Sequence, residues 1–233
     1  MLEFRSVASS SRGNVNVVTD GQATIMLDCG LAWKKVRQAL CFKTSAMAGV
    51  LLTHEHKDHS HGVREAAGAG VDVYMLRETR EALGLSGHRF HDVQIGQTFR
   101  VGPFSVVAFP LLHDVPCCGF LVAGAGEKLA YITDTSGVPG RLPALNLLAV
   151  ECNYCEDTLE ANAAAGRLHE SVRSRVAGSH FGLGGVLDLL RSMDRSRLQD
   201  VYLLHLSDAN ADVAQICVAV EQVVGAGVRV WWK

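Results

Sequence analysis

One ten-residue block constrains this chain more than any other feature. Residues 53–62 read Thr-His-Glu-His-Lys-Asp-His-Ser-His-Gly, directly after an apolar, strand-like stretch at 49–53. Imidazole nitrogen and carboxylate oxygen are ligands for zinc and its first-row neighbours, and the extended chain places alternate residues on one face. The block therefore predicts a metal site. Its candidate ligands are His54, His56, Asp58 and His59.

More polar residues stand where β-branched or aromatic stretches stop. Loops at strand ends are where proteins build sites, so a metal-binding type of residue at such a position is a candidate ligand or a support for one. These residues are Asp28, His113, Asp134 and His205.

The block has the form His-x-His-x-Asp-His, and with the strand-end residues it resembles the signature of the metallo-β-lactamase fold hydrolases. The resemblance extends from the first hairpin to His205. It implies an α/β fold, an αββα sandwich of the metallo-β-lactamase type, formed as one domain over residues 1–233. In that family Asp28 would be the aspartate that supports the metal site.

The hydrophobic pattern predicts strands and helices that fit this fold. Glycine- and proline-containing turns separate further strands within 91–133, and no linker or repeat is evident. The predicted strands are 2–8, 14–19, 23–28, 48–53, 71–74, 147–151, 200–205 and 228–232. The predicted helices are 31–41, 60–69, 77–84, 156–177, 183–194 and 211–224.

The resemblance implies two metal ions. His54, His56 and His113 would hold one, Asp58, His59 and His205 the other, and Asp134 would bridge both. Two cations about 3.5–4 Å apart lower the pKa of a bridging water, so that hydroxide attacks without a separate general base. Zinc is the expected metal and manganese the alternative. His61 lies outside the family pattern and is predicted to be a surface or supporting side chain.

Four segments resemble the corresponding motifs of the short YycJ-type phosphodiesterases, which are related to ribonuclease Z and include phage anti-Pycsar cyclic-nucleotide phosphodiesterases. The segments are 132–135, 151–154, 178–181 and 205–208. The chain departs from that group at Gly178-Ser179-His180-Phe181 and after Ser207, which puts specificity in doubt rather than the reaction type. The small-residue loop 8–14 suits close approach to a phosphate, although a hairpin turn would also explain it. Its Ser10, Ser11 and Asn14 are predicted to bind substrate.

His180 is the strongest candidate outside the ligand set. It precedes a glycine-rich helix start at 182–185, whose backbone donors would suit an anion. A histidine there could bind phosphate or protonate the leaving group, or it could simply cap the helix. Asp58 and His180 are therefore the residues predicted to be catalytic.

Charge bears on the substrate. The 22 basic and 24 acidic residues give a net charge of −2, whereas nucleases that hold long polyanions commonly carry a basic surplus. This favours cyclic mononucleotides, with exonuclease action on single-stranded DNA or RNA as the alternative. The basic cluster Lys34, Lys35, Arg37 and Lys43 could guide a strand or form a solvated helix face. A non-catalytic binding protein on a hydrolase scaffold is a third possibility, which the intact ligand set disfavours.

The number of cysteines and the hydropathy of the chain predict its cellular location and the state of its thiols. Seven cysteines, an odd number, with neither an export signal nor a membrane span predict reduced thiols in the cytoplasm. Cys152 and Cys155 have CxxC spacing but no second pair, so they are predicted to be free thiols. A homodimer is expected from the resemblance, and the apolar segment 228–232 could bury at its interface or in the sandwich.

Overall fold

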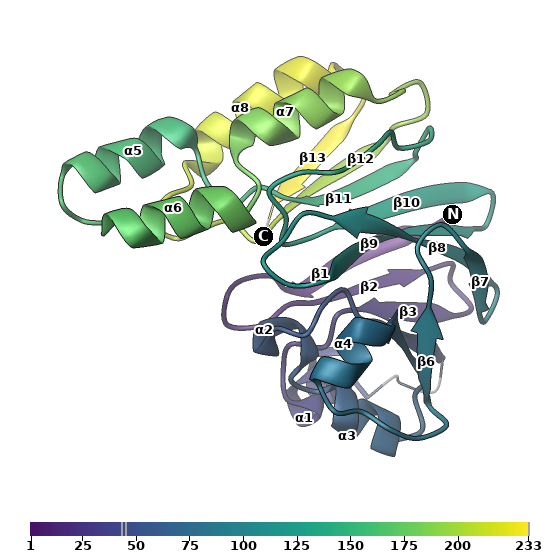
Figure 1. The fold of residues 1–233 in the computed structure, drawn as a ribbon. Coiled ribbons are helices and arrows are strands. Elements are labelled where there is room, and N and C mark those ends of the chain that lie inside the picture. The colour runs from purple at the N-terminus through teal and green to yellow at the C-terminus, as the bar shows by residue number, and fades with distance from the viewer. Residues whose placement is uncertain (43, 45, 233) are drawn as a thin grey trace. The chain divides into compact units, whose positions relative to one another are not determined.

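The computed structural model describes residues 1–42, 44 and 46–232, which divide into two compact units. The first unit comprises Met1–Pro110 and Val115–Tyr131, and the second comprises Leu111–Asp114 and Ile132–Lys233. The architecture is mixed α/β with two β-sheets, as the sequence predicts (Figure 1). That the whole chain forms one domain stays a prediction.

The first unit is built on a six-stranded sheet whose strands follow the order of the chain. Strand β2 pairs antiparallel with both β1 and β3, whereas β3, β4, β5 and β6 pair parallel in turn. The strands are β1 (Glu3–Ala8), β2 (Val15–Thr19), β3 (Thr24–Leu27), β4 (Met47–Leu51), β5 (Val73–Leu76) and β6 (Phe90–Val93).

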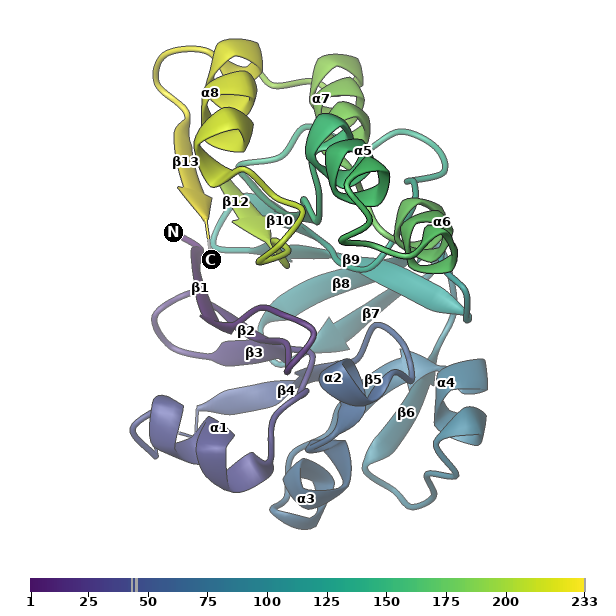
Figure 2. The same cartoon turned by 90° about the vertical axis from the view of Figure 1, so that its left-hand side faces the viewer.

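Four helices follow the parallel strands, and the helices labelled α1 and α3 lie on one face of this sheet (Figure 2). They are α1 (Trp33–Ala39), α2 (Lys57–Ser60), α3 (Val63–Gly68) and α4 (Arg77–Ala82). Trp33 of α1 and Val63 of α3 join the buried core under the sheet, together with Met26 and Val50 of its central strands. Burial of this core fixes β4, and so fixes where the chain emerges into the histidine-rich block.

Two antiparallel pairs complete the strands of the first unit. Strand β7 pairs with β8, and β10 pairs with β9. Their bounds are β7 (Thr98–Val101), β8 (Phe104–Leu111), β9 (Cys117–Gly124) and β10 (Glu127–Ile132), the last residues of β8 and β10 belonging to the second unit. The adjacent Cys117 and Cys118 are buried in β9, as core residues.

The second unit contains three parallel strands and four helices. Strand β12 pairs with β11 on one side and with β13 on the other. In both views α7 and α8 lie side by side (Figures 1 and 2). The elements are β11 (Leu147–Glu151), α5 (Glu156–Ala164), α6 (Glu170–Ser179), α7 (Leu183–Ser192), β12 (Asp200–Leu204), α8 (Val213–Val224) and β13 (Arg229–Trp232).

Two predicted helices are divided in the structure. The helix expected at 156–177 breaks between α5 and α6, where Gly166 adopts a left-handed φ of 68° and His169 caps α6 by accepting from the Ser171 amide at 3.2 Å. The helix expected at 60–69 is α2 followed by α3, with the break at Gly62, whose amide donates to the Cys29 carbonyl at 2.7 Å. The strand expected at 71–74 lies at Val73–Leu76.

The remaining expectations concern the thiols and the chain's last strand. All seven cysteines are free, and burial raises the pKa of both Cys152 and Cys155, which keeps these thiols protonated. Trp231 and Trp232 of β13 are 47% and 58% exposed, so these side chains are not buried in the second unit. Within the part of the chain that the structure describes, no helix is both long enough and apolar enough to span a membrane.

Candidate metal centre

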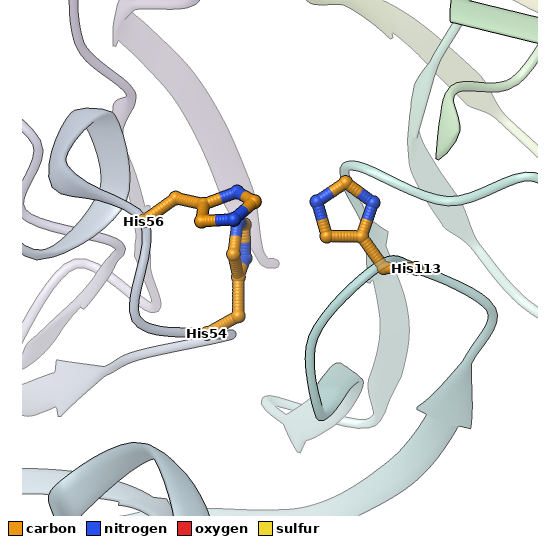
Figure 3. Close-up of side chains that lie close together, drawn as sticks. All are labelled: His54, His56 and His113. Carbon is orange, nitrogen blue, oxygen red and sulfur yellow. The ribbon is translucent and has the colours of Figure 1, made fainter. Parts of the chain in front are cut away.

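The block after β4 forms a tight histidine cluster in the first unit. His54 and His59 are fully buried, whereas His56 is partly exposed at the start of α2. The ring centroid of His54 lies 4.7 Å from that of His56 and 4.2 Å from that of His59. Figure 3 shows the rings of His54 and His56 projecting from this segment. The local fold therefore brings these predicted ligands together.

Asp28 is the anchor beneath this cluster. It ends β3 with a left-handed φ of 59° and is fully buried. One carboxylate oxygen accepts from the backbone amide and the hydroxyl of Thr53, both at 2.9 Å. The other lies 2.8 Å from His59 Nδ1 and accepts from the Tyr131 hydroxyl at 2.9 Å. Four donors thus hold one carboxylate, and that carboxylate orients His59.

Asn14 lies beneath the block as well. It is 1% exposed, and its side-chain amide nitrogen lies 2.9 Å from His59 Nε2 and 3.4 Å from Asp58 Oδ2. Its backbone amide also donates to the Asp58 carbonyl at 2.7 Å. Asn14 thus contacts the proposed ligands Asp58 and His59, and its contact with substrate stays a prediction. Ser11 is exposed and Ser10 is partly exposed, the latter with its hydroxyl accepting from the Arg12 amide at 3.2 Å.

His113, Asp134 and His205 belong to the second unit. The ring of His113, also labelled in Figure 3, follows β8, and its Nδ1 lies 2.8 Å from the Ser179 carbonyl oxygen. Its Nε2 lies 3.0 Å from Asp114 Oδ1. Asp134 follows β10 and is 3% exposed, with one carboxylate oxygen 3.2 Å from His205 Nδ1. Asp134 and His205, both predicted because they follow apolar strands, therefore lie beside each other.

Glu151 is a further candidate site residue, which the sequence alone did not single out. It is fully buried at the end of β11, and its carboxylate lies 2.6 Å from His180 Nδ1 and 2.8 Å from His205 Nδ1. It also accepts from the amides of Thr135 at 3.1 Å and Phe181 at 3.0 Å. The sequence offered a signal: Glu151 is a charged residue that ends an apolar strand, as Asp28 and Asp134 are.

Charge is concentrated in this part of the second unit. Burial and the nearby Asp134 disfavour ionisation of Glu151, yet hydrogen bonds from His180 and His205 hold its pKa below the ordinary value. Burial likewise opposes the charged form of His205, but Asp134 and Glu151 raise its pKa to about 10. The pKa of His180 is also raised, because Glu151 and Asp134 outweigh burial. Two buried carboxylates here face two imidazoles.

The hydrogen bonds of the imidazoles fit a metal site. His59 has its Nδ1 beside Asp28, His113 beside the Ser179 carbonyl, and His205 beside Glu151. An oxygen beside Nδ1 accepts a hydrogen bond from that nitrogen and orients the ring, as is typical of metal-ligating histidines. His54 Nδ1 lies 3.0 Å from the Thr53 hydroxyl, which itself donates to Asp28. The donor set therefore suits a divalent cation of the zinc type.

The helix start beyond His180 differs from the prediction. The Glu156 carboxylate accepts from the Gly184 amide at 3.0 Å, and the Leu183 amide donates to the Tyr154 carbonyl at 2.9 Å. A carboxylate of the chain itself therefore occupies the position expected for a bound anion, because a helix N-terminus attracts negative charge. His180 is partly exposed and is oriented by Glu151, not by this helix.

The fold and the donor set define a metal-dependent hydrolase, and comparison with known proteins agrees. The family model of the beta-lactamase superfamily domain matches residues 23–205. The chain is 27% identical to exodeoxyribonuclease WalJ of Streptococcus pneumoniae over 225 residues, which cover 90% of this chain and 83% of the relative. It is 28% identical to exodeoxyribonuclease YycJ of Bacillus anthracis over 224 residues, covering 88% and 83%.

A solved structure shows the same fold. The metallo-β-lactamase fold protein YhfI from Bacillus subtilis superposes with a TM-score of 0.77 at 15% identity, covering all of this chain and 96% of the other. The chain belongs to the β-lactamase superfamily and is a metal-dependent hydrolase with YycJ-type relatives. The predicted fold class, the resemblance and the enzyme class are thus confirmed, and the non-catalytic scaffold is set aside.

Proposed function

We propose that this chain is a phosphodiesterase that cleaves phosphodiester bonds of nucleic-acid strands. The observation that carries the proposal is the hydrogen bonding of the imidazoles, in which an oxygen atom lies 2.8–3.0 Å from Nδ1 of His54, His59, His113 and His205, an orientation typical of metal-ligating histidines. Support for a DNA strand comes from the two exodeoxyribonuclease relatives, which align with most of the chain. A cyclic mononucleotide is the second candidate, favoured by the net charge of −2.

Under this proposal, seven residues would hold two divalent cations, zinc in preference to manganese. When bound, such cations polarise the phosphoryl group and lower the pKa of water. His54, His56 and His113 would serve one ion, Asp58, His59 and His205 the other, and Asp134 both. Asp28 and Glu151 would orient ligands, because their carboxylates accept from His59 and His205. A homodimer in the cytoplasm remains part of the prediction.

His180 would be the proton donor for the leaving oxygen. Glu151 accepts from its Nδ1, which turns Nε2 outward from the buried carboxylate, and the side chain is 21% exposed, within reach of a substrate. Protonated His180 would donate from Nε2 to the leaving oxygen while Glu151 stabilises the resulting charge distribution. Ser10 and Ser11 remain candidates for contact with the substrate phosphate, while Asn14 serves the ligands.

The proposal predicts metal-dependent strand cleavage. Protein purified without chelators should contain about two equivalents of zinc or manganese per chain, and reconstituted protein should degrade labelled single-stranded DNA. Removal of the metal with a chelator should abolish cleavage, and re-addition should restore it. Elemental analysis and gel electrophoresis of the products measure the two effects. Metal-loaded protein that hydrolyses a 3′,5′-cyclic nucleotide and leaves DNA intact would favour the second candidate.

Replacing His180 should lower turnover without loss of bound metal. The His180→Ala variant should cleave DNA about 10²-fold more slowly, because the leaving oxygen loses its proton donor. Metal content and unfolding midpoint should stay near those of the parent protein. The exposed His88→Ala serves as the control and should retain full activity. Normal turnover of His180→Ala would instead support the capping role that the sequence also allows.

A further inference from the structure

A cationic cavity opens on the first unit beside the histidine-rich block. Its volume is about 340 Å³. It is lined by three loops or helices that lie far apart in the sequence, and their polar side chains are Ser11, Arg12, Lys35, Lys57, Asp58 and His61. Three of these are permanent cations and one is a carboxylate, so the lining attracts anions.

The cations of this cavity are available to a ligand. Arg12, Lys35 and Lys57 are all exposed, and among the residues that the structure describes none of them has an ion-pair partner. The basic residues predicted as one cluster around Lys35 do not share one environment. Lys35 lines the cavity, whereas Arg37 lies over the Phe42 ring with its guanidinium carbon 5.4 Å from the centroid. Lys43 lies outside the described residues.

Backbone hydrogen bonds fix the walls of the cavity relative to one another. The Asn14 amide donates to the Asp58 carbonyl at 2.7 Å, and the Gly30 amide donates to the Asn14 carbonyl at 2.8 Å. The Gly13 amide closes the serine-rich turn on the Ser10 carbonyl at 2.9 Å. The backbones that carry Arg12, Lys35 and Lys57 are therefore tied to one frame, which lowers the entropy that a ligand must overcome.

We infer that this cavity binds a phosphate of a nucleic-acid strand adjacent to the phosphodiester that is cleaved. Asp58 is a proposed metal ligand and also lines the cavity, so the two sites share a wall. A cyclic mononucleotide has one phosphate and cannot occupy both, whereas a strand presents a neighbouring phosphate. The inference rests on the proposed function and specifies its substrate: a single-stranded polyanion held by Arg12, Lys35 and Lys57.

Binding of an uncleaved strand tests this inference apart from catalysis. A fluorescent single-stranded DNA of about eight nucleotides, within the usual site size, is titrated with full-length protein in chelator. The variant Arg12→Gln, Lys35→Gln, Lys57→Gln should bind at least about 10-fold more weakly near 0.1 M salt. Its log–log salt slope should be flatter by about 0.7, since each strand phosphate that is neutralised contributes about that amount and the cavity holds one phosphate.

A matched triple variant controls for net charge. Lys34→Gln, Arg100→Gln, Arg141→Gln removes the same three charges from exposed positions that do not line the cavity, and its affinity should stay within about twofold of the parent. Equal losses in both triple variants, or parental affinity in the cavity variant, would overturn the inference. A cavity variant that loses affinity for inorganic phosphate but binds the strand as the parent does would also overturn it, in favour of a small-anion site.

The two proposals fail in different ways. If metal-loaded protein does not cleave DNA while the cavity variant still loses strand binding, the proposed hydrolytic function is wrong and the cavity assignment stands. If DNA is cleaved normally and the cavity variant binds the strand as the parent does, the cavity assignment is wrong and the proposed function stands.

Discussion

Replacing Glu151 with alanine should lower DNA turnover by at least about 10³-fold. One buried carboxylate orients both the proposed proton donor, His180, and the proposed ligand, His205. Loss of a general acid costs about 10²–10⁴-fold, and loss of a group that orients a metal ligand costs about 10–100-fold in affinity or activity. Metal content should therefore fall with turnover, a change that His180→Ala should not produce.

The same substitution should reduce stability. Alanine would leave the amides of Thr135 and Phe181 without their acceptor inside the second unit, and two imidazoles would lose their carboxylate. Removing one partner from such a buried charged network costs about 3–5 kcal/mol of unfolding free energy. Urea unfolding of the chelated protein measures this cost, separately from any stabilisation by bound metal.

A conservative variant keeps this prediction testable if alanine prevents folding. Glu151→Gln preserves volume and one acceptor oxygen but turns two donor hydrogens towards the amides and imidazoles, so turnover should still fall about 10²-fold. The control is Glu156→Ala, which removes a carboxylate that accepts from the Gly184 amide at the exposed start of α7 and should leave turnover within about twofold. Parental turnover and metal content in Glu151→Gln would remove Glu151 from the positioning role.

The sequence predicts well what local pattern determines. Asp28, Asp134 and His205 each follow a mostly buried, apolar strand, and a polar residue that follows such a strand must emerge at the sheet edge. That rule requires no knowledge of tertiary contacts, which is why the candidate residues outside the histidine-rich block follow from it; the fold class follows from the family resemblance. It also applies to Glu151, whose importance depends on two histidines 29 and 54 positions away.

The contacts that the sequence does not reveal are those between residues far apart in the chain. Asn14 belongs to a serine-rich turn typical of phosphate contact, yet its amide is used by Asp58 and His59, more than 40 positions away. The glycine-rich start of α7 suits an anion, and Glu156, at the start of α5, supplies one. The helix expected at 156–177 breaks because Gly166 can adopt φ of 68°, which a 3.6-residue pattern does not reveal.

Replacing Gly30 with alanine should lower the unfolding free energy by at least about 3 kcal/mol, or prevent the chain from accumulating as soluble protein. A Cβ at this position would lie 1.6 Å from the Asp58 carbonyl oxygen and 2.6 Å from the Asn14 amide nitrogen. Both atoms belong to the backbone, so no side-chain rotation can relieve the overlap. Overpacking commonly costs about 1–3 kcal/mol, and displaced backbone raises the cost.

The change that destabilises the Gly30→Ala variant should also disturb the proposed metal ligands. The Gly30 amide donates to the Asn14 carbonyl at 2.8 Å, and Asn14 in turn holds the Asp58 carbonyl. Moving the chain at Gly30 would separate the loop before β2 from α2, and with it the frame that orients Asp58 and His59. Metal retained by the soluble fraction should therefore fall together with stability.

Gly68→Ala is the matched control for this substitution. Gly68 ends α3 in the same unit, and a Cβ there would meet no atom within 4 Å. Alanine is the better helix former by about 1 kcal/mol, so the control should be as stable as the parent or more stable by up to that amount. Urea denaturation measures the unfolding free energy of both variants. A Gly30→Ala protein with parental unfolding free energy and metal content would show that the contact between residue 30 and the Asp58 backbone is not the constraint that brings the block's ligands together.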